Sequence, residues 1–233
     1  MRDFDLILFD LDGTLIGTAP EMADAVNDTL RDLGLPDVAQ QRVADWIGHG
    51  TRELLAQALA HAHQTTPDSE RGAADFERAK VRFDAHYHQR CGSRSRLYPQ
   101  VREALQALRG TGVKLAVVTN KEERYTRTVL DAHQLAPLFD RIVSGDSLPT
   151  KKPDPSGVIA CQEQFQVSRQ RSLFVGDSSI DVATARAAGV TVWALPYGYN
   201  MGRPIQDSQP DRVIQDFSAL LAVVAGPEER LNC

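Results

Sequence analysis

Two aspartates directly follow the first apolar run of the chain. The stretch "LILFDLDGTL" covers residues 6–15 and places Asp10 and Asp12 at the end of that run. A carboxylate in apolar surroundings needs a cation or hydrogen-bond donors to compensate its charge. Two carboxylates about 4 Å apart repel by about 4 kcal/mol at an effective dielectric constant near 20. This spacing therefore indicates a site that either holds a positive ion or is solvated.

Other polar residues follow later apolar runs in the same way. They are Thr119, Asn120, Lys152, Asp177 and Asp181. In open α/β sheets, ligands bind outside the carboxyl ends of the strands. If the strand before Asp10 is central in such a sheet, and the strands before Thr119 and Asp177 flank it, these side chains converge at one edge. Lys152 would reach the same place from the loop after a further strand.

Magnesium suits this set of ligands. It takes oxygen donors, keeps several waters and often binds through one or two carboxylates together with a substrate phosphate. We expect Asp10 and Asp177 to ligate by their side chains, and Asp12 by its backbone carbonyl. Asp181 lies one helical turn beyond Asp177. We assign it to the same metal site, where we expect it to position the ligands of the ion.

The chemistry expected of these residues is phosphoryl transfer. Asp10 would attack phosphorus and become an aspartyl phosphate. Asp12 would protonate the leaving oxygen and then deprotonate the water that hydrolyses the intermediate. Lys152 would neutralise negative charge. Hydroxyl and backbone N–H donors would hold the oxygens of the phosphate. We expect these donors to come from Thr119, Asn120, Gly13 and Thr14.

The elements that position these residues follow from periodicity. Uniformly apolar runs, which suit a parallel sheet covered on both faces, occur at 4–9, 113–118, 141–144, 172–175 and 190–195. Helical patterns lie between them, from Pro99 to Leu108 and over 122–133, 156–165 and 180–188. This alternation predicts a doubly wound, Rossmann-like α/β core.

A long insertion interrupts that alternation. About a hundred residues separate the first two strands, far more than a crossover needs, and they carry helical apolar stripes. We therefore predict a helical cap domain over residues 17–90, and a catalytic core formed by 1–16 and 91–233. The hinges would lie near 16–18 and 91–95.

Composition excludes several classes of function. The chain has 233 residues and a net charge of −5, so no basic excess indicates nucleic acid. We expect no membrane association, because no stretch approaches the roughly 20 apolar residues of a membrane span and the first apolar run is too short for a signal peptide. Cys91, Cys161 and Cys233 show no metal-ligand spacing, which favours reduced thiols and a cytoplasmic location. The oligomeric state is left open.

Four motifs together resemble the haloacid dehalogenase-like hydrolases. They are "DLDGT" at 10–14, "VVTN" at 117–120, "KKPDP" at 151–155 and "GDSSID" at 176–181, in the order of that family. The insertion looks like the first type of cap in this superfamily. "TAPEMADAVNDTL" at 18–30, "WIGHG" at 46–50 and "GDSSIDVATARAAG" at 176–189 are similar to the phosphoglycolate phosphatases within it.

This resemblance implies a magnesium-dependent phosphomonoesterase that hydrolyses 2-phosphoglycolate, a small-molecule substrate, through an aspartyl phosphate. Alternatives are a β-phosphoglucomutase-like phosphotransferase and a phosphatase of another small phosphomonoester. A carbon–halogen hydrolase is disfavoured, because related dehalogenases have no equivalent of Asp12. From a different class, a phospho-accepting signalling switch shares the acidic cluster and the lysine but needs no cap.

Two stretches outside the core motifs bear on the substrate. In "IGHGTREL" at 47–54, Gly48 and Gly50 permit backbone conformations that point N–H groups at an anion, and His49 and Arg52 add donors. We expect this loop to read the substrate carboxylate. "PYGYN" at 196–200 could line the rim of the site. At 17–18 this sequence has Gly-Thr, where many relatives have Asp-Ser. We expect this pair to contact none of the groups that carry out the chemistry.

Overall fold

Six parallel strands form the central sheet of this computed structural model, which describes residues 3–224. The order is β5-β4-β1-β6-β7-β8, so β1 is flanked by β4 and β6 as expected. The strands are β1 (Leu6–Phe9), β4 (Lys114–Val118), β5 (Arg141–Val143), β6 (Ser172–Gly176), β7 (Thr191–Ala194) and β8 (Arg212–Val213). The sequence indicated the first five, but β8 is too short to give an apolar run.

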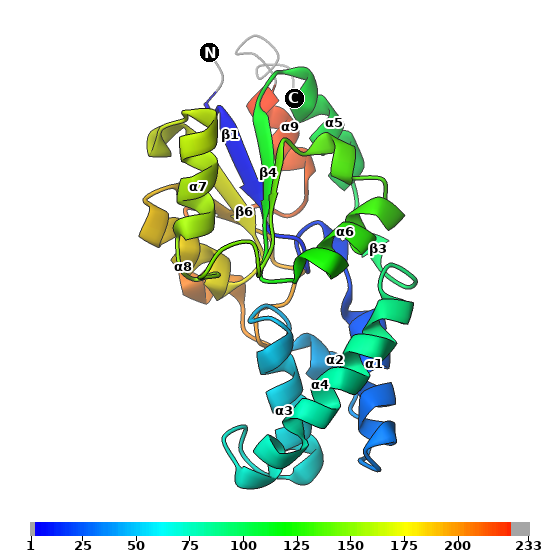
Figure 1. Cartoon of the computed structure of the whole chain (residues 1–233). Helices are drawn as coiled ribbons and strands as arrows, with labels where there is room; N and C mark the ends of the chain where they lie inside the picture. The colour runs from blue at the N-terminus through cyan, green and yellow to red at the C-terminus, as the bar shows by residue number, and fades with distance from the viewer. Residues whose placement is uncertain (1–2, 225–233) are drawn as a thin grey trace.

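Helices cover both faces of the sheet, which is why its central strands are apolar throughout. Leu6 and Leu8 point to one face, where they pack with residues of α7 (Ser156–Phe165) and α8 (Ser179–Ala188). Ile7 and Phe9 point to the other face. That face is covered by α5 (Val101–Gly110), α6 (Glu123–Ala132) and α9 (Ser218–Val224). Figure 1 shows this three-layer arrangement. Short 3-10 turns lie at Ala136–Leu138, Arg169–Arg171 and Ile205–Ser208.

The insertion forms a helical body beyond the carboxyl ends of the strands (Figure 1). It contains α1 (Ala19–Asp32), α2 (Gln40–Ala44), α3 (Thr51–His63) and α4 (Glu70–Arg90). A proline in the first turn of α1, where its missing N–H is no loss, and a Ser69 cap on α4 define two of the helix starts. The apolar stripes predicted at 22–33, 54–59 and 76–83 lie on α1, α3 and α4, whereas the short α2 was not anticipated.

The two connections between cap and core lie side by side. Strand β2 (Ile16–Gly17) pairs antiparallel with β3 (Arg96–Leu97), so the chain leaves and re-enters the core at one place. The fully buried carboxylate of Glu21 in α1 accepts hydrogen bonds from the backbone N–H groups of Gly92, Arg94 and Ser95. The predicted hinge segments at 16–18 and 91–95 lie at or next to this connection. The domain boundaries at 17 and 90 stay a prediction.

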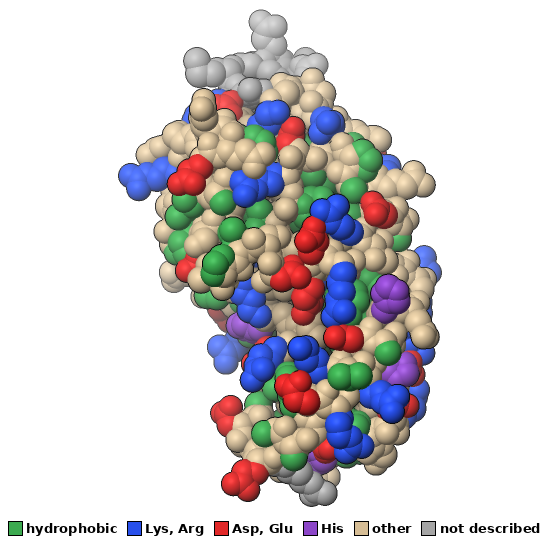
Figure 2. Space-filling view, viewed as in Figure 1, with side chains coloured by type: hydrophobic (Ala, Val, Ile, Leu, Met, Phe, Trp, Pro, Cys, Tyr) green, Lys and Arg blue, Asp and Glu red, His purple; other side chains and the backbone are tan. Residues whose placement is uncertain are grey.

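Acidic and basic side chains are interspersed over the face shown in Figure 2, as the modest net charge of −5 leads one to expect. Within residues 3–224, no helix has the length and apolar character needed to span a bilayer.

Candidate active site

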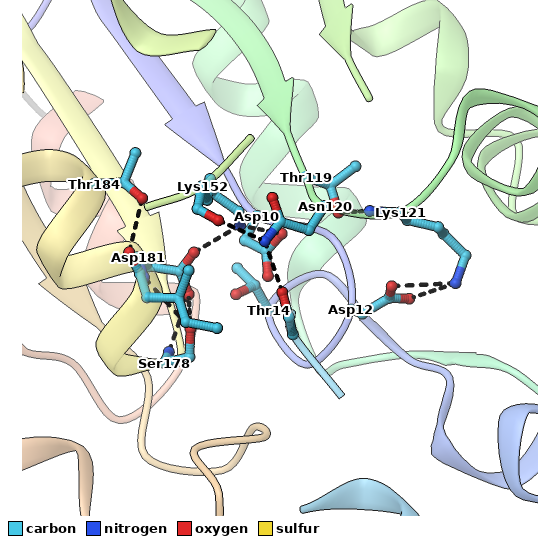
Figure 3. A network of polar contacts seen from close by, with 12 residues as sticks. Asp10, Asp12, Thr14, Thr119, Asn120, Lys121, Lys152, Ser178, Asp181 and Thr184 are labelled. Atoms are coloured by element: carbon cyan, nitrogen blue, oxygen red, sulfur yellow. Dashed lines mark hydrogen bonds and ion pairs between the residues drawn. The ribbon is translucent and has the colours of Figure 1, made fainter. Parts of the chain in front are cut away.

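Three buried carboxylates converge where β1 and β6 end. Asp10 follows β1, Asp177 follows β6, and Asp181 lies in the first turn of α8. Each offers an oxygen, and these oxygens lie within 4.8 Å of one another. Their residues are 6%, 2% and 0% exposed, respectively. Figure 3 shows two members of the cluster, Asp10 and Asp181, on either side of Lys152. Carboxylates this close and this buried are unfavourable in the charged form unless a cation or bound protons compensate them.

Electrostatics at the cluster are dominated by desolvation. Burial raises the pKa of Asp10 to about 7, against the attraction of Lys152. Burial, together with the charges of Asp181 and Asp10, raises the pKa of Asp177 well above its ordinary value. Lys152 Nζ lies 2.6 Å from Asp10 Oδ1 and 2.7 Å from Asp181 Oδ1. One ammonium does not balance three carboxylates, and an all-oxygen donor set fits a divalent magnesium ion.

Asp181 is held firmly by its neighbours. Its Oδ1 accepts a hydrogen bond from Lys152, and its Oδ2 accepts from the N–H of Asp177 and from the N–H and hydroxyl of Ser178. Ser178 and Asp181 also form a reciprocal capping box at the start of α8. Both oxygens are thus engaged, so Asp181 orients Lys152 and Asp177. Its assignment to the metal site stays a prediction.

Glycines allow close packing around Asp177. Gly13 has a φ of +93°, and a Cβ there would lie 2.3 Å from Asp177 Oδ2. A Cβ at Gly198 would lie 2.1 Å from the same atom. The Thr14 hydroxyl donates to Asp177 Oδ1, and the Tyr199 N–H donates to Oδ2. Gly13 and Thr14 therefore lie in the site, but their contacts are with this carboxylate. The "PYGYN" stretch likewise touches the site through Asp177.

Asp12 faces the cap. Figure 3 shows its carboxylate turned away from Lys152 and Asp181, toward Lys121. Lys121 Nζ lies 3.1 Å from each oxygen of Asp12, and the Thr18 hydroxyl donates to Oδ1 at 2.7 Å. The expectation that the pair at 17–18 touches no chemical group is therefore wrong for Thr18. Sequence reasoning also missed Lys121, although its place directly after the "VVTN" motif could have indicated it.

Thr119 and Asn120 lie at the end of β4, as expected. Both are buried, and both line the cavity next to Asp10. The Asn120 amide donates to the carbonyls of Gly48 and Lys152, at 2.8 and 2.9 Å. Its own oxygen has no hydrogen-bond partner among residues 3–224. Asn120 thus links the cap loop to the loop that carries Lys152.

The loop at 47–50 contacts core residues beside the site. Gly48 and Gly50 have φ values of +121° and +92°. Besides the contact from Asn120, Lys151 Nζ donates to the His49 carbonyl at 2.8 Å. The structure does not bring Arg52 into the site, because this residue is exposed and its guanidinium lies 4.9 Å from the centre of the Phe76 ring.

A cavity between cap and core contains the two aspartates of the first motif. Its core wall includes Asp10, Asp12, Thr119, Asn120, Lys121 and Glu122, and its cap wall includes Met22, Ile47, Gly48, Gly50, Thr51, Leu54 and Tyr87. Of the four cap residues predicted to bind substrate, Gly48 and Gly50 line this cavity. His49 and Arg52 are not among its lining residues. The cavity has a volume of about 20 Å³, which is close to the space that one water molecule needs. The cap must therefore move away from the core before a phosphate at Asp10 and a short organic group toward Asp12 can enter.

Comparison with known proteins agrees with this geometry. Residues 7–195 match the family model described as haloacid dehalogenase-like hydrolase. A phosphoglycolate phosphatase of Aliivibrio fischeri is 40% identical over 96% of this chain and 98% of its own length. One of Pseudomonas putida is 42% identical over 95% of this chain and 80% of its own length. The crystal structure of a predicted phosphoglycolate phosphatase from Haemophilus somnus has a TM-score of 0.90 and 37% identity, covering 97% of this chain and all of that one.

Proposed function

The chain belongs to the haloacid dehalogenase-like hydrolases, and we propose that it is a magnesium-dependent phosphatase that converts 2-phosphoglycolate and water to glycolate and phosphate. The observation that carries this proposal is the opposite orientation of the two aspartates. Both line the cavity under the cap, but Asp10 lies in the carboxylate cluster beside Lys152, whereas Asp12 is paired with Lys121. This arrangement separates a nucleophile from an acid–base group.

In the first step, a carboxylate oxygen of Asp10 attacks phosphorus. The bond from phosphorus to the ester oxygen breaks as the new bond to Asp10 forms, and Asp12 gives a proton to the departing glycolate oxygen. Lys152, fixed by Asp181, holds Asp10 and offsets the charge of the phosphate. Thr119 and Asn120 lie on the same wall and orient the phosphate oxygens.

In the second step, Asp12 takes a proton from a water molecule. That water attacks phosphorus, the bond from phosphorus to Asp10 breaks, and phosphate leaves with the Asp10 carboxylate restored. Closure of the cap loop over the cavity keeps bulk water away until the aspartyl phosphate has formed. Contacts from Asn120, Lys151 and Glu122 to the cap hold this closed arrangement.

Asp10 and Asp177 would hold the magnesium ion by their carboxylates, and Asp12 would hold it by its carbonyl. When bound, the ion neutralises charge on the phosphate and on the cluster. Thr14 and the Tyr199 N–H fix the orientation of Asp177 for this task.

Two observations support the finer parts of the proposal. The relatives named phosphoglycolate phosphatase match nearly the whole chain, including the cap that selects the substrate. We also propose a cytoplasmic location, because the thiols of Cys91 and Cys161 are free and buried, as is usual for proteins of reducing compartments.

Phosphate release from a small panel of phosphomonoesters tests the function. With magnesium present, we expect 2-phosphoglycolate to be hydrolysed faster than ethyl phosphate or glucose 6-phosphate, and EDTA to stop the reaction. Conversion of β-glucose 1-phosphate to glucose 6-phosphate would instead indicate the phosphotransferase. A phosphorylated chain that releases no phosphate would indicate a signalling switch.

A further inference from the structure

Lys121 is a buried cation that the mechanism above does not use. Its side chain is 2% exposed, and Nζ lies 3.1 Å from both oxygens of Asp12 and 4.9 Å from the centre of the Tyr87 ring. It lines the same cavity as Asp10 and Thr119. The two contacts of Nζ with the Asp12 carboxylate are those of an ammonium ion in a buried ion pair.

A buried ion pair is weak evidence for a role in stability. Removing both ions from water costs free energy that their mutual attraction repays only in favourable geometry. The distribution of charges along the cavity also indicates a role for Lys121. At one end of the cavity, Lys152 pairs with Asp10 and Asp181, and the carboxylates there would hold the magnesium ion proposed above. Lys121 is a second cation, at the end that faces the cap.

We propose that Lys121 binds the carboxylate of the substrate and so selects phosphate esters of short 2-hydroxy acids; this inference rests on the proposed function. In 2-phosphoglycolate, one methylene separates the ester oxygen from the carboxylate carbon. Asp12 must reach that ester oxygen in order to protonate it. An ammonium already bonded to Asp12 is therefore within reach of the carboxylate. Because an ammonium has three N–H donors, it can bond both groups.

The surroundings of Lys121 favour this role over the residues first expected to perform it. The guanidinium of Arg52 lies over Phe76, and His49 is not among the cavity residues. The cap wall is apolar at Met22, Ile47 and Leu54. A substrate carboxylate placed there without a cation would be desolvated and unpaired, which is unfavourable. The amino end of α3 at Thr51 adds a weaker attraction for an anion.

The test compares two substrates and two matched variants. Ethyl phosphate has the skeleton of 2-phosphoglycolate with a methyl group in place of the carboxylate. Lys121→Met should lower the ratio of kcat/KM for 2-phosphoglycolate to that for ethyl phosphate by about 30-fold or more, which corresponds to about 2 kcal/mol. Most of this loss should be a higher KM for 2-phosphoglycolate. Lys114→Met, which removes an exposed pair with Asp140 at the other end of β4, should leave the ratio unchanged.

The outcomes separate this inference from the proposed function. If the wild type itself shows no preference for 2-phosphoglycolate, the proposed substrate is wrong. If the wild type shows it and Lys121→Met keeps the same ratio, or loses activity on both substrates in proportion, the inference is overturned and the function stands. If Lys121→Met does not fold by circular dichroism, Lys121→Gln keeps an uncharged donor beside Asp12, and the same ratio decides.

Discussion

At the scale of single residues, the site depends on two aspartates of the same motif in different environments. Asp10 is enclosed by carboxylates and Lys152, and Asp12 by Thr18 and Lys121. The next two residues of the motif, Gly13 and Thr14, lie on the turn after β1 and are explained by their contacts with Asp177. Gly13 must lack a side chain because Asp177 occupies the space, and Thr14 supplies the hydroxyl that orients Asp177.

Replacement of the acid–base residue should slow both chemical steps. We expect Asp12→Asn to lower kcat by about 10²–10⁴-fold, the usual contribution of a positioned acid or base. Steady-state phosphate release with saturating 2-phosphoglycolate measures the effect. Asp45→Asn, on the surface of the cap beside Arg42, is the control and should keep wild-type kcat. An Asp12→Asn enzyme within a few-fold of wild type would contradict this role.

The raised pKa of Asp10 predicts how magnesium binding depends on pH. Because burial raises this pKa from 3.8 to about 7, the metal-free folded state binds a proton that the unfolded state has lost across that window. The stability that this bound proton contributes is fully present below the pKa of Asp10 in the unfolded state, and it is lost as the pH rises through about 7. A metal must displace this proton.

The measurable consequence is a magnesium effect that grows with pH. The rise in Tm produced by magnesium, relative to EDTA, should be larger at about pH 8 than at about pH 5.5, because the ligands must be deprotonated to bind the metal. Thermal unfolding at both pH values measures it, with Asp177→Asn as the variant that should lose the effect. An equal rise at both pH values would argue against a protonated cluster.

At the scale of elements, the cap is tied to the core by a few specific contacts. Glu21 of α1 bonds three backbone N–H groups of the returning hinge. Glu21→Gln should lower the free energy of unfolding by about 2 kcal/mol, since hydrogen bonds to charged groups contribute about 1.5–3 kcal/mol. Glu123→Gln, which removes an exposed pair with Arg127, should cost under about 0.5 kcal/mol. Chemical denaturation measures both, and equal effects would show that Glu21 is not a hinge tie.

The loop before α3 should act through closure. Gly50 has a φ of +92°, and a Cβ there would lie 2.8 Å from Lys151 Nζ. Gly50→Ala should therefore hinder closure and lower kcat/KM for 2-phosphoglycolate and ethyl phosphate in similar proportion. The sequence alone suggested that this loop reads the carboxylate. A selective loss on 2-phosphoglycolate would restore that interpretation in place of Lys121.

At the scale of the whole molecule, the sequence predicted what periodicity and motif order encode. The apolar strands, the helices between them and the inserted cap follow from patterns of residues close in the chain. β8 and α2 are too short to produce such a pattern. The contacts of Thr18 and Lys121 with Asp12 also escaped prediction, because they depend on how the cap entry and the end of β4 meet in space. The packing of Arg52 on Phe76 could not be predicted for the same reason, since a helical position does not reveal it.

The most direct test of the account is to look for the phosphorylated nucleophile. Asp12→Asn protein mixed with 2-phosphoglycolate and magnesium, then quenched in acid, should gain the mass of one phosphoryl group, and peptide mapping should place it on the segment that contains Asp10. Asp10→Asn protein treated alike should show no adduct and no turnover. Phosphate release by Asp10→Asn at the wild-type rate, or an adduct mapped to another segment, would contradict the assignment of Asp10 as the nucleophile.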